Sequence, residues 1–125
     1  AFDRKSQSFR DFVLTRISKV TIKDSPNEDE SAQADNEWQR LIPLQLIPHP
    51  KNVEHPTAIE MDYGMENRQL LIEVRAAMAG YLLRRWNVDC TERGTLIGPE
   101  YQLWLLNRFA LNNVPNLTIA PGYEA

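Results

Sequence analysis

Histidine and cysteine, the side chains best suited to bind a metal or attack a substrate, are few in this sequence. The chain has two histidines, His49 and His55, and one cysteine, Cys90. A structural zinc site needs four such ligands and a catalytic site usually three, so this count argues against a metal site. Cys90 also follows Asp89 and lies two residues before Glu92, and acidic neighbours raise the pKa of a thiol. We therefore expect neither a metal ion nor a cysteine nucleophile.

Other catalytic patterns are also missing from the sequence. Serines occur only at positions 6, 8, 18, 25 and 31, and none lies in a nucleophile elbow. None of the five glycines belongs to a phosphate-binding loop. The sequence therefore predicts a protein that is not an enzyme and needs no cofactor. An enzyme is the alternative if the fold joins Glu73, His49 and Cys90 in one polar pocket.

Arg10 and Arg16 form a candidate binding pair. They lie six positions apart in an extended pattern, so on a strand both side chains point to the same face. Two guanidinium groups on one face can bind a phosphate or a carboxylate. Basic residues on an exposed strand also keep its edge soluble without binding anything, and the spacing alone leaves both interpretations open.

Length and composition indicate one soluble domain. The chain has 125 residues, of which 42% are hydrophobic and 25% charged, as is ordinary for globular proteins. Its 14 basic and 17 acidic residues give a net charge of -3, which argues against a protein that coats nucleic acid. Because the chain lacks a long apolar segment and has a single cysteine, we expect a cytoplasmic protein without a membrane span.

The charges divide the chain into three segments. Residues 1–23, the head, hold six basic and two acidic residues, whereas residues 24–37 hold six acidic residues and no basic one. This acidic segment also lacks large apolar side chains, so it cannot bury enough surface to offset the entropy of ordering. We interpret residues 24–37 as a flexible linker and residues 38–125 as a folded body.

Hydrophobic patterning in the body predicts an α+β fold, a small mixed sheet with two or three packed helices. Residues 38–47 and 69–74 are predicted strands, and Pro43 should restrict the first of them to an edge or a bulge. Helices are predicted over residues 55–64, with a strand over part of this range as the alternative, and over residues 75–86, where apolar residues recur at helical spacing.

Two further elements are expected near the ends of the chain. Residues 9–17 alternate like a strand with two partly apolar faces, which needs cover on both sides. Residues 100–112 are a predicted helix, and eight of the eleven residues from 101 to 111 are apolar all round it. A body this small has few elements to cover such a helix. We therefore expect it to contact a second subunit through Tyr101, Trp104, Leu105 and Phe109. A short strand is expected over residues 117–120.

Several short motifs, in order, resemble one family of bacterial proteins. The head segment FRDFVLTRI resembles the closing strand of the WYL domain, a small Sm-like barrel. The later segments resemble the C-terminal extension that follows this domain in transcriptional regulators: EWQRLIPLQLIPHP, AIEMDYGM, VRAAMAGYLLRRWNVD and EYQLWLLN. The resemblance covers roughly residues 9–112, and it is strongest to the WYL regulators found near phage-defence systems.

The resemblance implies a regulatory function. Members of this family bind DNA as dimers through an N-terminal winged helix-turn-helix, which lies outside this sequence, as does most of the barrel. They respond to a nucleotide or nucleic-acid effector at the WYL domain, where Arg10 and Arg16 match basic positions of its closing segment. The expected function is therefore dimerisation and transmission of an effector signal. An anion-binding or oligonucleotide-binding module that uses the two arginines is the alternative.

Overall fold

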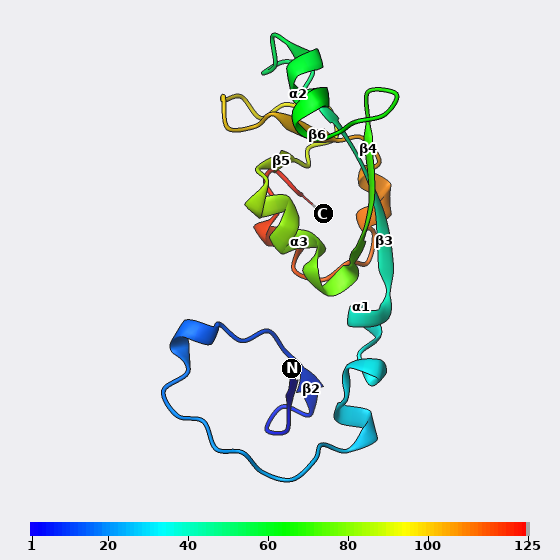
Figure 1. Ribbon diagram of the computed structural model, residues 1–125. Helices are drawn as coiled ribbons and strands as arrows, with labels where there is room; N and C mark the ends of the chain where they lie inside the picture. Colours follow the sequence, from blue (N-terminus) through cyan, green and yellow to red (C-terminus); the bar gives the residue numbers. More distant parts are fainter. Residues whose placement is uncertain (125) are drawn as a thin grey trace.

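The structure is a computed structural model that describes residues 1–124. In Figure 1 the body is built around one sheet, and the head and linker extend from it as an open loop. Within the described residues, no helix is long and apolar enough to cross a membrane.

Four strands of the body form a mixed sheet in the order β4-β3-β6-β5. Strand β3 (Leu41–Pro48) pairs antiparallel with β4 (Leu70–Arg75) on one side and with β6 (Leu103–Leu105) on the other. Strand β5 (Val88–Asp89) runs parallel to β6 at the far edge. The mixed sheet and its helices confirm the predicted α+β fold.

Three helices belong to this fold. Helix α2 (Pro56–Asp62) begins with a proline in its first turn, as the sequence predicts, and α3 (Ala76–Arg85) follows β4 without a loop. The short α1 (Asn36–Gln39) joins the linker to β3, and the Asp35 side chain accepts a hydrogen bond from the Trp38 backbone N–H at its start. Both predicted helices, over residues 55–64 and 75–86, are confirmed.

The core lies between the inner face of the sheet and α3. Alternation along β3 buries Ile42, Leu44 and Leu46 while neighbouring side chains face outward. Helix α3 covers this face with its buried Ala79 and Leu83. A Cβ at Gly80 would lie 2.4 Å from the backbone oxygen of Asn116, so glycine allows the loop before residue 117 to pack directly on α3.

Strand β3 as a whole is an inner strand and not the edge strand expected from the sequence, but Pro43 itself lies at a local edge. The reason is that β6 pairs only with the far end of β3, from Leu46 to Pro48. Among the described residues, β4 is the single strand beside β3 at Pro43, so the missing N–H of proline breaks no ladder on the other side. There Asn107 Nδ2 donates a hydrogen bond to the Pro43 carbonyl at 2.9 Å.

The helix predicted over residues 100–112 is wrong. Leu103–Leu105 form β6, and a 3-10 helix spans Arg108–Leu111. Inward-facing Leu103 and Leu105 are fully buried against the core, so the apolar run reflects a strand and a turn that bury different residues. The strand expected over residues 117–120 is also wrong, because Leu117–Ile119 form a 3-10 helix.

The strand predicted over residues 9–17 does not form as one element. The head contains a two-stranded hairpin of β1 (Phe2–Asp3) and β2 (Ser8–Phe9), followed by a 3-10 helix at Leu14–Arg16. Residues 10–29 are all exposed. The Arg10 backbone still exchanges hydrogen bonds with Ala1 at the end of the hairpin. No strand among the described residues pairs with residues 11–17, so their backbone groups have no ladder to join.

The acidic linker contains local structure of its own. It forms 3-10 helices at Glu28–Glu30 and Ala32–Ala34, and Glu30 closes a capping box with Asn27. The Glu30 carboxylate also accepts two hydrogen bonds from Arg4, at 2.8 and 2.9 Å, which connect the linker to the head. The division of the chain at residues 23 and 37 stays a prediction.

Candidate functional site

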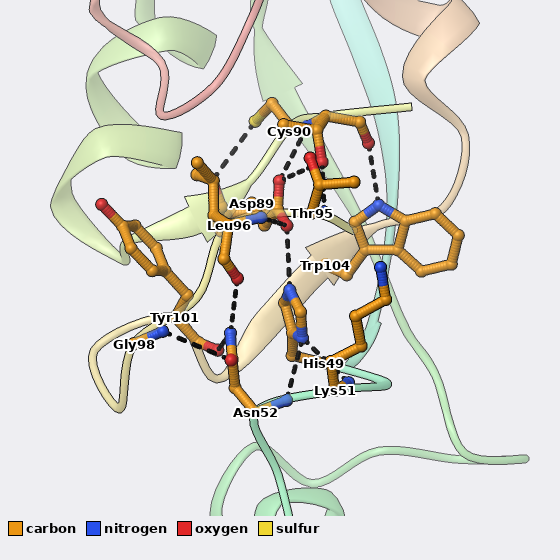
Figure 2. Close-up of polar contacts among 12 residues, drawn as sticks. His49, Lys51, Asn52, Asp89, Cys90, Thr95, Leu96, Gly98, Tyr101 and Trp104 are labelled. Carbon is orange, nitrogen blue, oxygen red and sulfur yellow. Dashed lines mark hydrogen bonds and ion pairs between the residues drawn. The ribbon is translucent and has the colours of Figure 1, made fainter. Parts of the chain in front are cut away.

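A buried histidine and aspartate form the main polar cluster of the body (Figure 2). His49 follows β3 and Asp89 ends β5, and both side chains are fully buried. His49 Nε2 lies 2.8 Å from Asp89 Oδ2. His49 Nδ1 accepts hydrogen bonds from the backbone N–H groups of Lys51 and Asn52, so the ring proton is on Nε2 and donates to Asp89.

Asp89 is saturated with hydrogen bonds. Its Oδ1 accepts from the Thr91 backbone and hydroxyl at 2.8 and 2.7 Å, and its Oδ2 accepts from the Leu96 backbone at 3.0 Å. Burial raises the pKa of this carboxyl, but the hydrogen bonds from Thr91, His49 and Leu96 outweigh burial and hold the pKa below its ordinary value. Asp89 is therefore a stable anion that joins the loop after β3 to the loop after β5.

The cluster extends through Asn52 to the loop before β6. Asn52 Nδ2 donates to the carbonyls of Leu96 and Tyr101 at 2.8 and 3.1 Å, and its Oδ1 accepts from the Gly98 N–H. Trp104 Nε1 donates to the Thr91 carbonyl at 2.9 Å. Every polar group in this list holds loop backbone rather than facing an open cleft, so the cluster fastens one end of the sheet.

The arrangement does not support catalysis by the residues considered from sequence. Cys90 is fully buried, and burial followed by the charge of Asp89 raises the pKa of its thiol to about 12. Glu73 is exposed on β4, so it does not share a pocket with His49 and Cys90. His55 is exposed before α2, and the residues that the structure describes contain no group of three or more metal-binding side chains.

The pairing of His49 with Asp89 was not predicted from the sequence. The two residues are 40 positions apart, and local patterns contain no information on that contact. One signal was available, because Asp89 stands between the apolar Val88 and Cys90 and an acid in such a strand needs a buried partner.

Arg10 and Arg16 do not lie on one face of a strand, so the expectation from their spacing that they share a strand face is wrong. Arg10 follows β2, and its Nη1 lies 3.6 Å from Asp3 Oδ2, whereas Arg16 ends the 3-10 helix of the head. Both side chains are exposed. Anion binding by these arginines stays a prediction.

The four residues expected at a subunit contact have different environments. Leu105 is fully buried in the core and has no surface to offer a partner. Trp104 is half-buried and holds the Thr91 loop, and Tyr101 is half-buried before β6. Phe109 is 75% exposed and can meet another molecule.

One set of side-chain hydrogen bonds connects the head to the body. Asp11 Oδ2 accepts from the Tyr81 hydroxyl of α3 at 2.8 Å and from Asn116 Nδ2 at 2.9 Å. Beside this contact lies a cleft of about 490 Å³, lined from the head by residues such as Phe9 and Arg10 and from the body by Met78 and Tyr81. Asp11 thus fixes the head against α3.

The segment from β3 to Leu111 matches a known class of protein domain, the dimerization domain of transcriptional regulators. Residues 41–111 match the family described as "BrxR transcriptional regulator, C-terminal dimerization domain", and the chain belongs to this family. The expected kinship with WYL-type transcriptional regulators is thereby confirmed for this C-terminal region.

Curated relatives are similar over most of the chain. The DNA-binding transcriptional repressor CapW of Escherichia coli (strain KTE188) is 34% identical over 110 residues, which cover 86% of this chain and 36% of that protein. CapW of Pseudomonas aeruginosa is 35% identical over 92 residues, which cover 71% of this chain and 29% of that protein. The chain therefore spans about a third of the length of these relatives.

The His49–Asp89 cluster predicts how stability depends on pH. Because the pKa of Asp89 is depressed in the folded state, its contribution to stability is complete above the unfolded-state pKa of about 3.9 and is lost as the pH falls through the folded-state value. We expect Asp89→Asn to lower the free energy of unfolding at pH 7 and to flatten its decline below about pH 4. Urea titrations between pH 3 and 7 measure both effects.

The control for this measurement is Asp62→Asn, which changes an exposed carboxyl at the end of α2. It should leave both the stability at pH 7 and its decline in acid unchanged. Equal stability of Asp89→Asn and the unmodified chain at pH 7 would contradict the role assigned to the cluster.

Proposed function

We propose that this chain is the C-terminal part of a DNA-binding transcriptional repressor of bacteria, in which the body joins two subunits and the head transmits the state of an effector domain. Its support is the family match over residues 41–111 and the similarity to repressors, of which the matched segment covers about a third. In this proposal, DNA is bound by an N-terminal winged helix-turn-helix of the whole regulator, in the cytoplasm, and no part of the chain is catalytic.

The observation that carries the coupling is the double hydrogen bond of Asp11. One carboxylate oxygen connects the head to α3 through Tyr81 and to the loop packed on α3 through Asn116. Asn116 in turn lies against Gly80 of the same helix. A displacement of the head would therefore break hydrogen bonds to two neighbouring elements of the body at once.

The apolar side chains of the head support a further domain beside it. Between residues 12 and 22 the head exposes side chains that a soluble protein normally buries, all at least 50% exposed: Phe12, Val13, Leu14, Ile17, Val20 and Ile22. Several exposed apolar side chains within one short segment are typical of a surface that contacts another protein or domain. A WYL barrel, whose closing segment the head resembles, would supply this cover and the effector site.

Transmission then requires two arrangements of the head that differ in free energy by a small amount. An effector can shift this balance only if it binds one arrangement more tightly than the other. Asp11 contributes to one arrangement because its hydrogen bonds form only when the head lies on α3. The acidic linker provides the length of chain that lets the head leave α3 while the body stays intact.

The dimerisation part of this proposal is tested by the mass of the chain in solution. Sedimentation equilibrium from about 1 to 100 μM should give twice the 14.5 kDa of the chain at the upper end of this range. A mass that stays at 14.5 kDa throughout would contradict dimerisation by this region.

The coupling part is tested by the ionisation of Tyr81. Its hydrogen bond to Asp11 is the largest of the causes that raise the pKa of Tyr81, ahead of burial and the negative charge of Asp11. We expect Asp11→Ala to lower this pKa toward the ordinary value of about 10, measured by NMR with ring-labelled tyrosine and assigned with Tyr81→Phe.

The matched control is Asp3→Ala, which removes another head carboxylate that bonds only within the head and so should leave the Tyr81 transition in place. The same Tyr81 transition in Asp11→Ala and in the unmodified chain would refute the contact between head and α3.

A further inference from the structure

The outer face of the sheet, opposite α3, is only half covered. Over β6 it is closed by the loop after β5, because Trp104 donates to the Thr91 carbonyl and packs beside Gly94. Over β3 and β4, and just beyond β6, large apolar side chains remain exposed. We call this region the open sheet face and define it by three residues with their exposed fractions: Leu41 51%, Leu71 66% and Leu106 43%.

The middle of the open sheet face is a row of three side chains that crosses the strands. Gln45 of β3 is directly opposite Leu71 of β4, and on its other side the Leu106 N–H donates to the Gln45 carbonyl at 2.9 Å. Opposite residues of paired strands share a face, so Leu71 and Gln45 point outward together. Two hollows, of about 480 and 260 Å³, flank this row, and Leu106 lines the first and Leu71 the second.

Two opposite charges lie on either side of the row. Arg68 and Glu60 line the hollow of about 480 Å³, and Glu73 lines the hollow of about 260 Å³. Arg68 and Glu73 are exposed, and neither forms an ion pair with any of residues 1–124. The open sheet face thus has an apolar and amide centre, with the exposed Glu73 on one side and the exposed Arg68 on the other.

The other exposed apolar residues of the body are accounted for differently. Met78 and Tyr81 of α3 line the cleft between the head and the body. Trp86 lies beside the Tyr63 ring at a centroid distance of 6.3 Å. Ile97 and Met61 are single exposed side chains in a loop and on α2, which need no partner. Among the described body residues, the open sheet face is where exposed apolar side chains line two neighbouring hollows, Leu106 the first and Leu71 the second.

We propose that two copies of this chain associate through the open sheet face, with the twofold axis along the row of Leu71, Gln45 and Leu106. The inference rests on the proposed dimerisation function and adds the location and geometry of the contact. A twofold axis brings each residue against a symmetric copy of the same surface. Each row residue then meets its own copy, and Glu73 approaches the partner subunit's Arg68 on both sides of the axis.

A second copy fits this face better than an unrelated partner because the face is self-complementary. A half-turn about the row exchanges the two sides, so the exposed Glu73 of each copy lies opposite the partner's Arg68. The apolar centre excludes water from the contact, as at the core of a homodimer interface. The family is described as a dimerization domain, so a surface that contacts a second copy is expected within residues 41–111.

Charge reversal tests this geometry with variants at exposed positions. Glu73→Arg and Arg68→Glu each place two like charges together at both ends of the interface, and each should raise the dimer dissociation constant about tenfold or more. The double variant restores opposite charges and should return the constant to within about threefold of the unmodified chain. Sedimentation equilibrium at low salt gives the constants, and high salt should weaken both single effects.

The apolar centre is tested by Leu71→Glu, which brings two carboxylates together on the axis and should abolish dimers below about 100 μM. Ile97→Glu is the matched control, because Ile97 is 73% exposed but lies outside the open sheet face, and it should leave the constant unchanged. Thermal unfolding checks that each variant folds. If Leu71→Glu does not fold, the charge-reversal variants decide the question.

The possible failures are distinguishable. An unmodified chain that remains a monomer refutes dimerisation itself. An unmodified dimer whose dissociation constant is insensitive to the reversals and to a folded Leu71→Glu variant refutes this interface while leaving dimerisation intact. Weakened single variants without recovery in the double variant refute the proposed twofold axis.

Discussion

The pairing of β3 with strands on both sides is the constraint on which the rest of the structure depends. Its inward residues, Ile42, Leu44 and Leu46, supply the floor of the core on which α3 packs. The strand also contains Pro43, which cannot donate to a second ladder. The chain resolves this by ending β6 before Pro43 and placing Asn107 beside it, whose side chain replaces backbone partners of β3. Termination of β6 in turn leaves residues 106–111 free to turn outward.

Local signals in the sequence were sufficient for elements whose determinants lie within a few residues. Pro56 in a first turn and the apolar spacing before Arg85 correctly predicted α2 and α3. The segment around Trp104 was misassigned because its all-round apolar pattern arises from sheet neighbours and a turn, and a single sequence does not contain those distant partners. The same applies to His49 and Asp89, whose contact joins the ends of two strands far apart in the chain.

In the proposed function, the two sides of the body have different roles. On one side, Tyr81 of α3 donates a hydrogen bond to the Asp11 carboxylate of the head, and this bond forms only when the head lies on α3. On the other side the sheet leaves an apolar and charged surface uncovered. The buried cluster of His49 and Asp89 keeps the intervening loops rigid, so the two sides belong to one firm unit. A regulator needs this separation, because the contact that senses must move while the contact that joins subunits persists.

In the proposed dimer, the sheet and not α3 forms the contact between the two copies. Hydrogen–deuterium exchange of the full chain, measured at concentrations below and above the dimer dissociation constant, tests it most directly. If the open sheet face is the interface, exchange at high concentration should be slower in the backbone around β4 and residues 105–109 and unchanged in the loop near Ile97. Protection that appears instead over α3, with none over β4, would contradict this location of the interface.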